Sequence, residues 1–177
     1  MEKIISINYE DEKLMEVING YTLALSLLDD YDHQCLKSKK GNKTLHRVTY
    51  EEAKNLINGL RFKDSSEVFG IEKEKGKLEG IYAAVYQEVF GKQVYDSIEL
   101  KAANLLYFLI KDHPFVDGCK RIAATLFIHF LYKNNALYKN DKQVIDNNTL
   151  ASITLLIAMS NPLEKEVIIN FVANLLC

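Results

Sequence analysis

Two long apolar stretches joined by a short polar connection constrain the fold of this chain most strongly. The first, residues 98–113, is apolar on nearly every side after Ala102, and the second, residues 121–135, is similarly apolar. Each is expected to form a buried helix. Proline occurs only twice in 177 residues, whereas Leu, Ile, Ala, Lys and Glu abound, which favours helices over a turn-rich β fold. The sequence therefore predicts an all-α domain around a central buried helical hairpin.

Helical spacing of apolar residues and signals at helix ends predict the remaining helices. Thr49 and Glu52 form a capping-box pattern, Ser97 is a good N-cap, and Pro162 suits the first position of the last helix. The predicted helices are residues 14–28 with a weak point at Gly20, 48–60, 78–90 closed by Gly91, 146–160 and 162–176.

The chain shows no internal repeat, no low-complexity segment and no clean domain boundary. We predict a helical lead-in, residues 1–75, packed on a core of residues 76–177 in one compact domain overall. Residues 61–77 have two glycines and little periodicity, and are expected to be a loop or a short hairpin. A segment in this position, just ahead of the polar connection, could cover or clamp a partner.

Composition restricts the classes of partner and compartment. The formal net charge of −2 gives no overall field that favours nucleic acid or an anionic membrane. No apolar run is long enough to span a bilayer, and the N-terminus lacks the pattern of a signal peptide. Three cysteines far apart in the sequence fit reduced thiols better than a disulfide framework. A cytoplasmic location is the expectation.

The polar connection "HPFVDGCKR", residues 113–121, concentrates the reactive side chains of the chain. The amides of Gly118, Cys119 and Lys120 would open the second apolar helix, where unpaired N–H groups and the helix dipole favour an anion. Gly118 allows the backbone to approach a ligand closely. Arg121 could bind phosphate oxygens with its fork of donors. These groups suit a bound polyphosphate.

Two further residues of the connection add chemistry to this anion site. Asp117 is a hard oxygen ligand that could hold Mg²⁺ against the same phosphates, and it could also cap the second helix. His113 carries an imidazole, the side chain best suited to act as a base at physiological pH, and could take a proton from an attacking hydroxyl. Base, metal ligand, amide cradle and arginine together form a set for phosphoryl-type transfer.

Other interpretations of these residue types compete with this one. His113, Asp117 and Cys119 could be zinc ligands, but their spacing is not that of a zinc finger and no second cluster completes the site. Cys119 near a helix N-terminus could have a lowered pKa and sense oxidants, although an inert substitution is the simpler interpretation. Asp32, His33 and Cys35 resemble a second metal site, but a helix end with solvated acids explains them.

The connection resembles the motif of the Fic/Doc family, HPFx(D/E)GN(G/K)R. The apolar stretches before and after it are similar to the helices that bracket that motif, and the resemblance covers residues 76–177. The earlier part is similar, less specifically, to the lead-in of the RhuM-like or cell-filamentation Fic group. The resemblance implies a Fic-type helical bundle with a central buried helix–loop–helix and a short β-hairpin flap.

The resemblance assigns a role to each matching position. It implies that His113 is the catalytic base, Asp117 the Mg²⁺ ligand and Phe115 the aromatic anchor of the loop. Residues Gly118, Cys119 and Lys120 fall on the anion-binding loop, and Arg121 falls on the arginine that holds nucleotide phosphates.

The resemblance also implies a reaction and its participants. Fic enzymes usually transfer AMP from ATP, with Mg²⁺, to a Ser, Thr or Tyr hydroxyl of a target protein. The flap ahead of the motif aligns the target segment by strand-like pairing, and residues 61–77 are the candidate flap from their position. Neither a membrane nor a nucleic acid is an expected partner, whereas self-association and an antitoxin are the further associations that the family suggests.

The sequence departs from the family pattern at several positions. Cys119 replaces an asparagine, and a thiol is a poor donor beside an amide, so phosphate binding should weaken. Lys120, where AMP-transferring members usually have glycine, and Ala124, where a second arginine belongs, are features of the Doc branch, which transfers the terminal phosphate instead. Residues 75–80 match the family's inhibitory glutamate motif only in part, so Glu79 is expected to be an ordinary acid in the first turn of a helix.

Three functional hypotheses remain open at this point. The first is protein adenylylation, with Doc-like phosphorylation as its closest alternative. The second is a degenerate Fic domain that binds a partner without chemistry, suggested by Cys119. The third is the toxin of a toxin–antitoxin pair.

Overall fold

The computed structural model describes residues 9–60 and 66–177. These residues divide into two units, with the division between Leu36 and Lys37. Residues 37–60 and 66–75, which we assigned to the lead-in, lie in the same unit as the predicted core that begins at residue 76. The packing of the first unit on the second stays a prediction.

Within its described residues, 9–36, the first unit contains two helices, α1 (Tyr9–Asn19) and α2 (Thr22–Asp32). The predicted single helix over residues 14–28 is wrong, because the weak point at Gly20 is a complete break. There the Thr22 hydroxyl donates to the Asn19 carbonyl at 2.7 Å, which satisfies a carbonyl at the end of α1. No residue of α2, all of which the structure describes, is buried.

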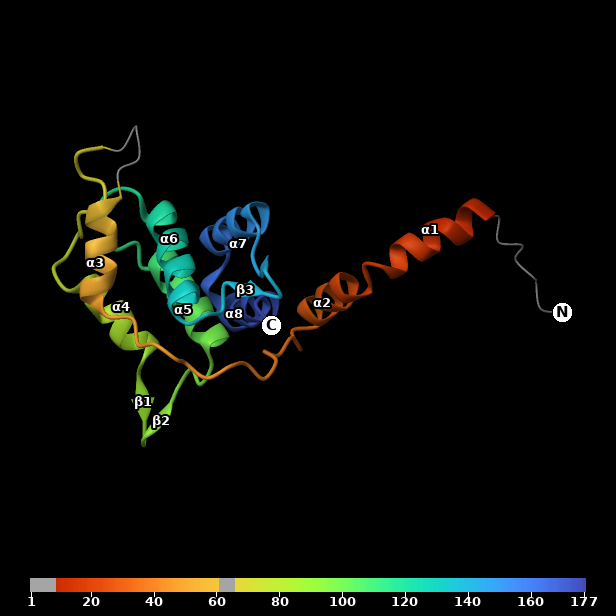
Figure 1. The fold of residues 1–177 in the computed structure, drawn as a ribbon, viewed down its shortest axis with the longest axis horizontal. Coiled ribbons are helices and arrows are strands. Elements are labelled where there is room, and N and C mark those ends of the chain that lie inside the picture. The colour runs from red at the N-terminus through yellow and green to blue at the C-terminus, as the bar shows by residue number, and fades with distance from the viewer. Residues whose placement is uncertain (1–8, 61–65) are drawn as a thin grey trace. The chain divides into compact units, whose positions relative to one another are not determined.

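The second unit is helical and is built around α5 (Ile98–Lys111) and α6 (Cys119–Lys133), which pack side by side (Figure 1). Helix α5 is buried along almost its whole length, and it also contacts α4 (Lys77–Val85), α7 (Asn147–Met159) and α8 (Lys165–Leu175). This arrangement confirms the all-α class and the central buried hairpin. It follows from the apolar character of α5 on nearly every side.

The predicted helix starts are mostly confirmed. Thr49 and Glu52 form a reciprocal capping box at α3 (Tyr50–Gly59), and Ser97 accepts from the Leu100 amide at 3.1 Å at the start of α5. Pro162 begins a single 3₁₀ turn, η1 (Pro162–Glu164), that leads into α8. Local side-chain signals therefore fix where these helices begin.

The predicted end of the helix over residues 78–90 is wrong. Helix α4 stops at Val85, and Phe90 and Gly91, both with positive φ, form the tip of a hairpin between β1 (Glu88–Val89) and β2 (Lys92–Gln93). Two residues with positive φ match the two-residue turns that fit the twist of a hairpin. A similar hairpin joins β3 (Tyr138–Lys139) and β4 (Lys142–Gln143). Neither hairpin lies in residues 61–77.

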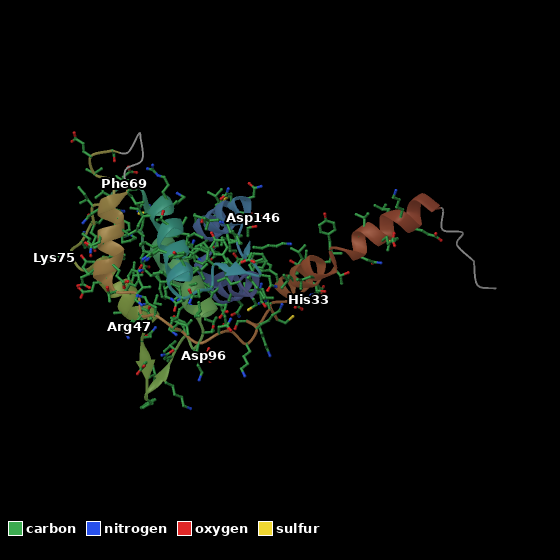
Figure 2. All side chains as sticks on the ribbon, viewed as in Figure 1. His33, Arg47, Phe69, Lys75, Asp96 and Asp146 are labelled. Carbon is green, nitrogen blue, oxygen red and sulfur yellow. The ribbon has the colours of Figure 1, made fainter. Side chains whose placement is uncertain are left out.

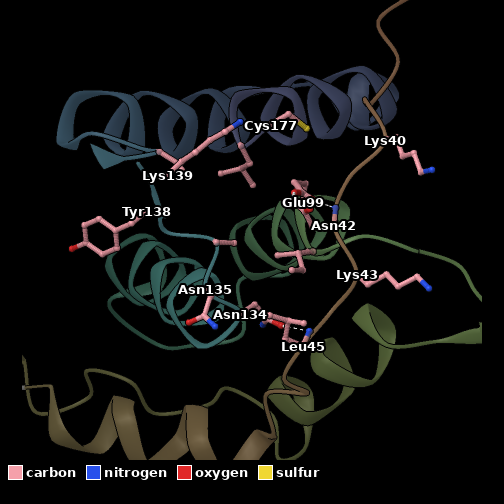
Figure 3. Close-up of a pocket in the computed structure, with 14 residues that line it drawn as sticks. Lys40, Asn42, Lys43, Leu45, Glu99, Asn134, Asn135, Tyr138, Lys139 and Cys177 are labelled. Carbon is pink, nitrogen blue, oxygen red and sulfur yellow. Dashed lines mark hydrogen bonds between the residues drawn. The ribbon is translucent and has the colours of Figure 1, made fainter. Parts of the chain in front are cut away.

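A clamp fastens the start of the second unit to the end of the central hairpin that is remote from the connection (Figure 3). The buried carboxylate of Glu99 accepts from the backbone N and the Nδ2 of Asn42, at 2.9 and 2.8 Å. The buried Asn134 Oδ1 accepts from the amides of Leu45 and His46, both at 3.0 Å. A pocket of about 540 Å³ lies beside this clamp.

Within the described residues, no helix has both the length and the apolar composition needed to cross a membrane.

Candidate active site

The connection between α5 and α6 is built on two residues with left-handed backbone. His113 follows the end of α5 with φ +48°, and Gly118 immediately precedes α6 with φ +87°. Between them Phe115 is only 1% exposed and anchors the loop in the core, at the position where the resemblance implied an aromatic anchor. The conformation of His113 is one that glycine ordinarily takes after a helix, so it carries strain at this position.

The prediction that Asp117 caps α6 is wrong. Gly118 occupies the N-cap position, and the Asp117 carboxylate instead accepts from the Ser66 hydroxyl at 2.6 Å. The hydrogen bond from Ser66 is the main reason that the pKa of Asp117 lies below its usual range. Arg121 lies 3.9 Å from the same carboxylate and acts in the same direction. Asp117 is therefore ionised at neutral pH and half-exposed.

One cavity of about 230 Å³ collects the predicted site residues. It lies where the connection enters α6, and the N–H groups of the first turn of that helix are available to an anion because a helix leaves them without intrahelical partners. The cavity is lined by His113, Val116, Asp117, Gly118, Cys119, Lys120 and Arg121.

Phe69 packs on the glycine of this site. Phe69 is labelled in Figure 2 and belongs to the segment between α3 and α4. A Cβ on Gly118 would lie 2.3 Å from Cε2 of the Phe69 ring, so this position needs glycine for contact as well as for its backbone. The Arg121 guanidinium lies 4.9 Å from the centroid of the same ring. Phe69 therefore supports both the anion loop and the arginine.

The segment that contains Phe69 pairs with the connection in a strand-like manner. The Val116 amide donates to the Ile71 carbonyl at 2.8 Å, and the Lys73 amide donates to the Pro114 carbonyl at 2.9 Å. Two isolated β-bridges mark this pairing. Residues 61–65 of the candidate flap lie outside the described residues. The described part of the candidate flap forms turns that lie against the connection, in the position that a flap would occupy.

His113 is exposed at the rim of the cavity, and its ring is held by a residue that the sequence did not single out. The Nζ of Lys73 lies 2.9 Å from Nδ1 of His113. The two residues are 40 positions apart, and a lysine within "EKEKGK" has the appearance of a solvated charge. Only the pairing of residues 69–73 with the connection brings Lys73 to the histidine.

The Cys119 side chain is buried, although the residue lies among those that line the cavity. The residue is 5% exposed, and its thiol donates to the Phe115 carbonyl at 3.2 Å. Burial raises the pKa of this thiol, which keeps it protonated and unreactive. The oxidant-sensor interpretation is thus contradicted, and the amide of Cys119 remains available to an anion.

The zinc interpretations find no support. Among residues 9–60 and 66–177, no group of three or more His, Cys, Asp or Glu side chains could hold a metal ion. His33 instead pairs with Asp29 one helical turn away, at 3.2 Å, on the exposed end of α2. The exposed Glu79 lies in the first turn of α4, as expected of an ordinary helix acid.

The model of the Fic/DOC family matches residues 38–131, which is more than half of the chain. The chain belongs to the Fic/DOC family. No curated protein and no solved structure matched the chain. The Fic/DOC match includes the segment before the connection, all of α5, the connection itself, and α6 as far as Leu131.

Three residues depart from the Fic/DOC motif, and the structure shows where each one lies. Cys119 fills a buried position, so the mismatch with asparagine does not obstruct the cavity. Lys120 is exposed and lines the cavity. Ala124, one turn after Arg121, supplies no second arginine.

Proposed function

We propose that this Fic/DOC protein transfers AMP from ATP to a hydroxyl side chain of a target protein. The observation that carries the proposal is that one cavity is lined by His113, the ionised Asp117, the first residues of α6 and Arg121. These are the groups that phosphoryl-type transfer requires, namely a base, a metal ligand and donors for phosphate oxygens.

The reaction would form one bond and break one. The target oxygen attacks the α-phosphorus of ATP, the bond from that phosphorus to the bridging oxygen of the β-phosphate breaks, and pyrophosphate leaves. The proton of the target hydroxyl passes to the imidazole of His113. The amides of Gly118, Cys119 and Lys120 and the Arg121 guanidinium hold the phosphate oxygens and offset their charge.

Asp117 is the residue that would hold Mg²⁺. Its carboxylate is ionised, half-exposed and at the edge of the cavity. One carboxylate suits this ion, because Mg²⁺ commonly takes one or two carboxylates and completes its shell with substrate phosphates and waters. The ion would neutralise charge on the phosphates.

Doc-like transfer of the terminal phosphate is the second candidate. Lys120 and Ala124 favour it, because the Doc branch shares this lysine and lacks the second arginine. The third candidate is a binding module without catalytic activity. The unreactive, buried Cys119 in place of asparagine suggests it. Location in the cytoplasm, self-association and control by an antitoxin belong to the same proposal.

Transfer of label from ATP separates these candidates. The full chain would be incubated with a cell lysate and ATP·Mg²⁺ labelled at either the α- or the γ-phosphate, and the modified proteins would be examined by intact mass. Adenylylation predicts that the α label enters protein, whereas transfer of the γ label alone would exclude it. His113→Ala should abolish transfer, and His33→Ala, at an exposed histidine of the first unit, is the matched control.

Restoring the family residue tests the binding-module alternative. Cys119→Asn should retain transfer, because the Cys119 side chain is buried and the amide that would hold a phosphate oxygen belongs to the unchanged backbone. If neither the wild-type protein nor this variant transfers any label, while both still bind ATP, the binding module becomes the better account.

A further inference from the structure

The contact between Lys73 and His113 determines which imidazole nitrogen can accept a proton. The two side chains are exposed, but the backbone of Lys73 is fixed by its hydrogen bond to the Pro114 carbonyl, next to the histidine. The Nζ–Nδ1 distance of 2.9 Å is that of a hydrogen bond. The contact therefore belongs to the pairing of two backbone segments.

The direction of this hydrogen bond follows from the chemistry of the two groups. A lysine ammonium has three donors and no acceptor, so the Nδ1 of His113 must be the acceptor. A neutral imidazole has one nitrogen with a free lone pair, and its proton lies on the other. With Nδ1 bound to Lys73, the ring proton is on Nε2. In this arrangement His113 has no free lone pair for the proton of a target hydroxyl.

No carboxylate of the described residues holds Lys73 away from the histidine. None of the ion pairs within that part of the chain includes Lys73, and the nearby Glu72 accepts from Lys54 and from the amide of Leu78. Asp117, the acid in the cavity, accepts from Ser66 and faces Arg121. The ammonium of Lys73 is thus available to an anionic group brought by another molecule.

We propose that Lys73 is a specificity-determining residue, which selects targets with an acidic side chain beside the modified hydroxyl. The target carboxylate pairs with the Lys73 ammonium, the ammonium leaves Nδ1, and the freed imidazole can accept the hydroxyl proton. A target without this acid leaves the base engaged. The inference rests on the proposed function, because it assumes that His113 is the base.

The first experiment measures the tautomer of His113 without any activity. Nitrogen-15 NMR of the full chain, labelled at histidine, distinguishes a protonated Nε2 from a protonated Nδ1. The wild-type protein should show Nε2–H with Nδ1 as acceptor, and Lys73→Met should shift the ring toward a mixture of tautomers. Lys75→Met, at an exposed lysine two positions away, should leave the signals unchanged. A wild-type ring with its proton on Nδ1, or a Lys73→Met spectrum identical to that of wild type, would overturn the inference.

The second experiment measures specificity with defined probes. Synthetic peptides with one Ser, Thr or Tyr are offered with ATP·Mg²⁺, and each peptide is compared with a twin in which the neighbouring Asp is replaced by Asn. Wild type should favour the Asp peptide in kcat/KM by about fivefold, the value of a good exposed ion pair. Lys73→Met should lose this preference, and Lys73→Glu should favour the Asn peptide.

The outcomes separate the inference from the proposed function. Equal rates for both peptides with wild type would refute the specificity of Lys73 while leaving transfer by His113 intact. Absence of transfer to every peptide and to lysate proteins, with Nε2–H still observed, would refute the proposed function and with it the role of Lys73. Transfer that persists in His113→Ala would likewise refute both.

Discussion

Substitution of Gly118 by alanine tests how the loop of the candidate site is supported. Two separate costs are expected. A left-handed backbone destabilises the folded state by about 1–2 kcal/mol when the residue has a Cβ. About 0.5–1 kcal/mol of this loss is offset, because alanine lowers the conformational entropy of the unfolded chain. The new Cβ would also lie 2.3 Å and 2.6 Å from two carbons of the Phe69 ring, against about 3.5–4 Å for an ordinary contact. Displacing the ring should cost about 1–3 kcal/mol, as overpacking does.

A matched glycine isolates the backbone cost from the steric one. Gly76 has nearly the same conformation, φ +85°, at the N-cap of α4, but an added Cβ would meet nothing within 4 Å. Gly76→Ala should therefore lower the free energy of unfolding by about 1 kcal/mol or less, and Gly118→Ala by about 2–4 kcal/mol. Equilibrium unfolding in urea would measure both values.

A double-mutant cycle with Phe69→Ala attributes the difference to the ring. Removal of the ring removes the overlap, so the double variant should be less destabilised than the sum of the single variants by about 1–3 kcal/mol. If the two substitutions are additive to within about 0.5 kcal/mol, Phe69 does not pack on Gly118 and the support proposed for the anion loop is wrong.

Other consequences of the structure can be measured separately. His113→Asn should raise the free energy of unfolding by about 0.5–1 kcal/mol in urea, because asparagine tolerates the left-handed conformation, while transfer activity is lost. An unchanged or lower stability would show that the residue is not strained. Thiol titration of the native protein should modify Cys35 and Cys177 quickly and Cys119 only after unfolding. Rapid modification of all three would contradict the burial of Cys119. Burial lowers the pKa of His129 below its usual 6.5, so the unfolded chain binds more protons and stability should fall as the pH drops below 6.5. His129→Leu should reduce this loss, as measured by unfolding at pH 7.5 and pH 5, and an identical pH dependence would contradict it.

The central hairpin and most helix starts could be predicted because their causes are local in the sequence. The apolar residues of α5 and α6 specify burial by themselves, and Thr49 and Ser97 satisfy backbone donors only three residues away. The hairpin at residues 88–93 was missed because the apolar pattern continues through Val89 and Phe90, whereas the left-handed pair at Phe90 and Gly91 decides the turn.

The chemistry of the site was predictable in its residue types but not in its contacts. The connection supplied the residues that line the cavity, and the family pattern supplied the anchor at Phe115. The partners Ser66, Phe69 and Lys73 come from a segment about 40 to 50 positions earlier, which pairs with the connection by backbone hydrogen bonds. Such pairing has no periodicity in the sequence, so neither the displacement of Asp117 from the N-cap nor the contact to His113 could be foreseen.

The central claim is that the joint between α5 and α6 binds the phosphates of a nucleotide opposite His113. Backbone amide NMR of the full chain during titration with ATP·Mg²⁺ tests it most directly. The signals of Gly118, Cys119 and Lys120 should shift with one saturating curve, and Arg121→Ala should weaken that curve by about tenfold, the value of a lost charged hydrogen bond. If those amides do not move while ATP binds elsewhere, or if no signal moves at millimolar ATP, the claim is contradicted.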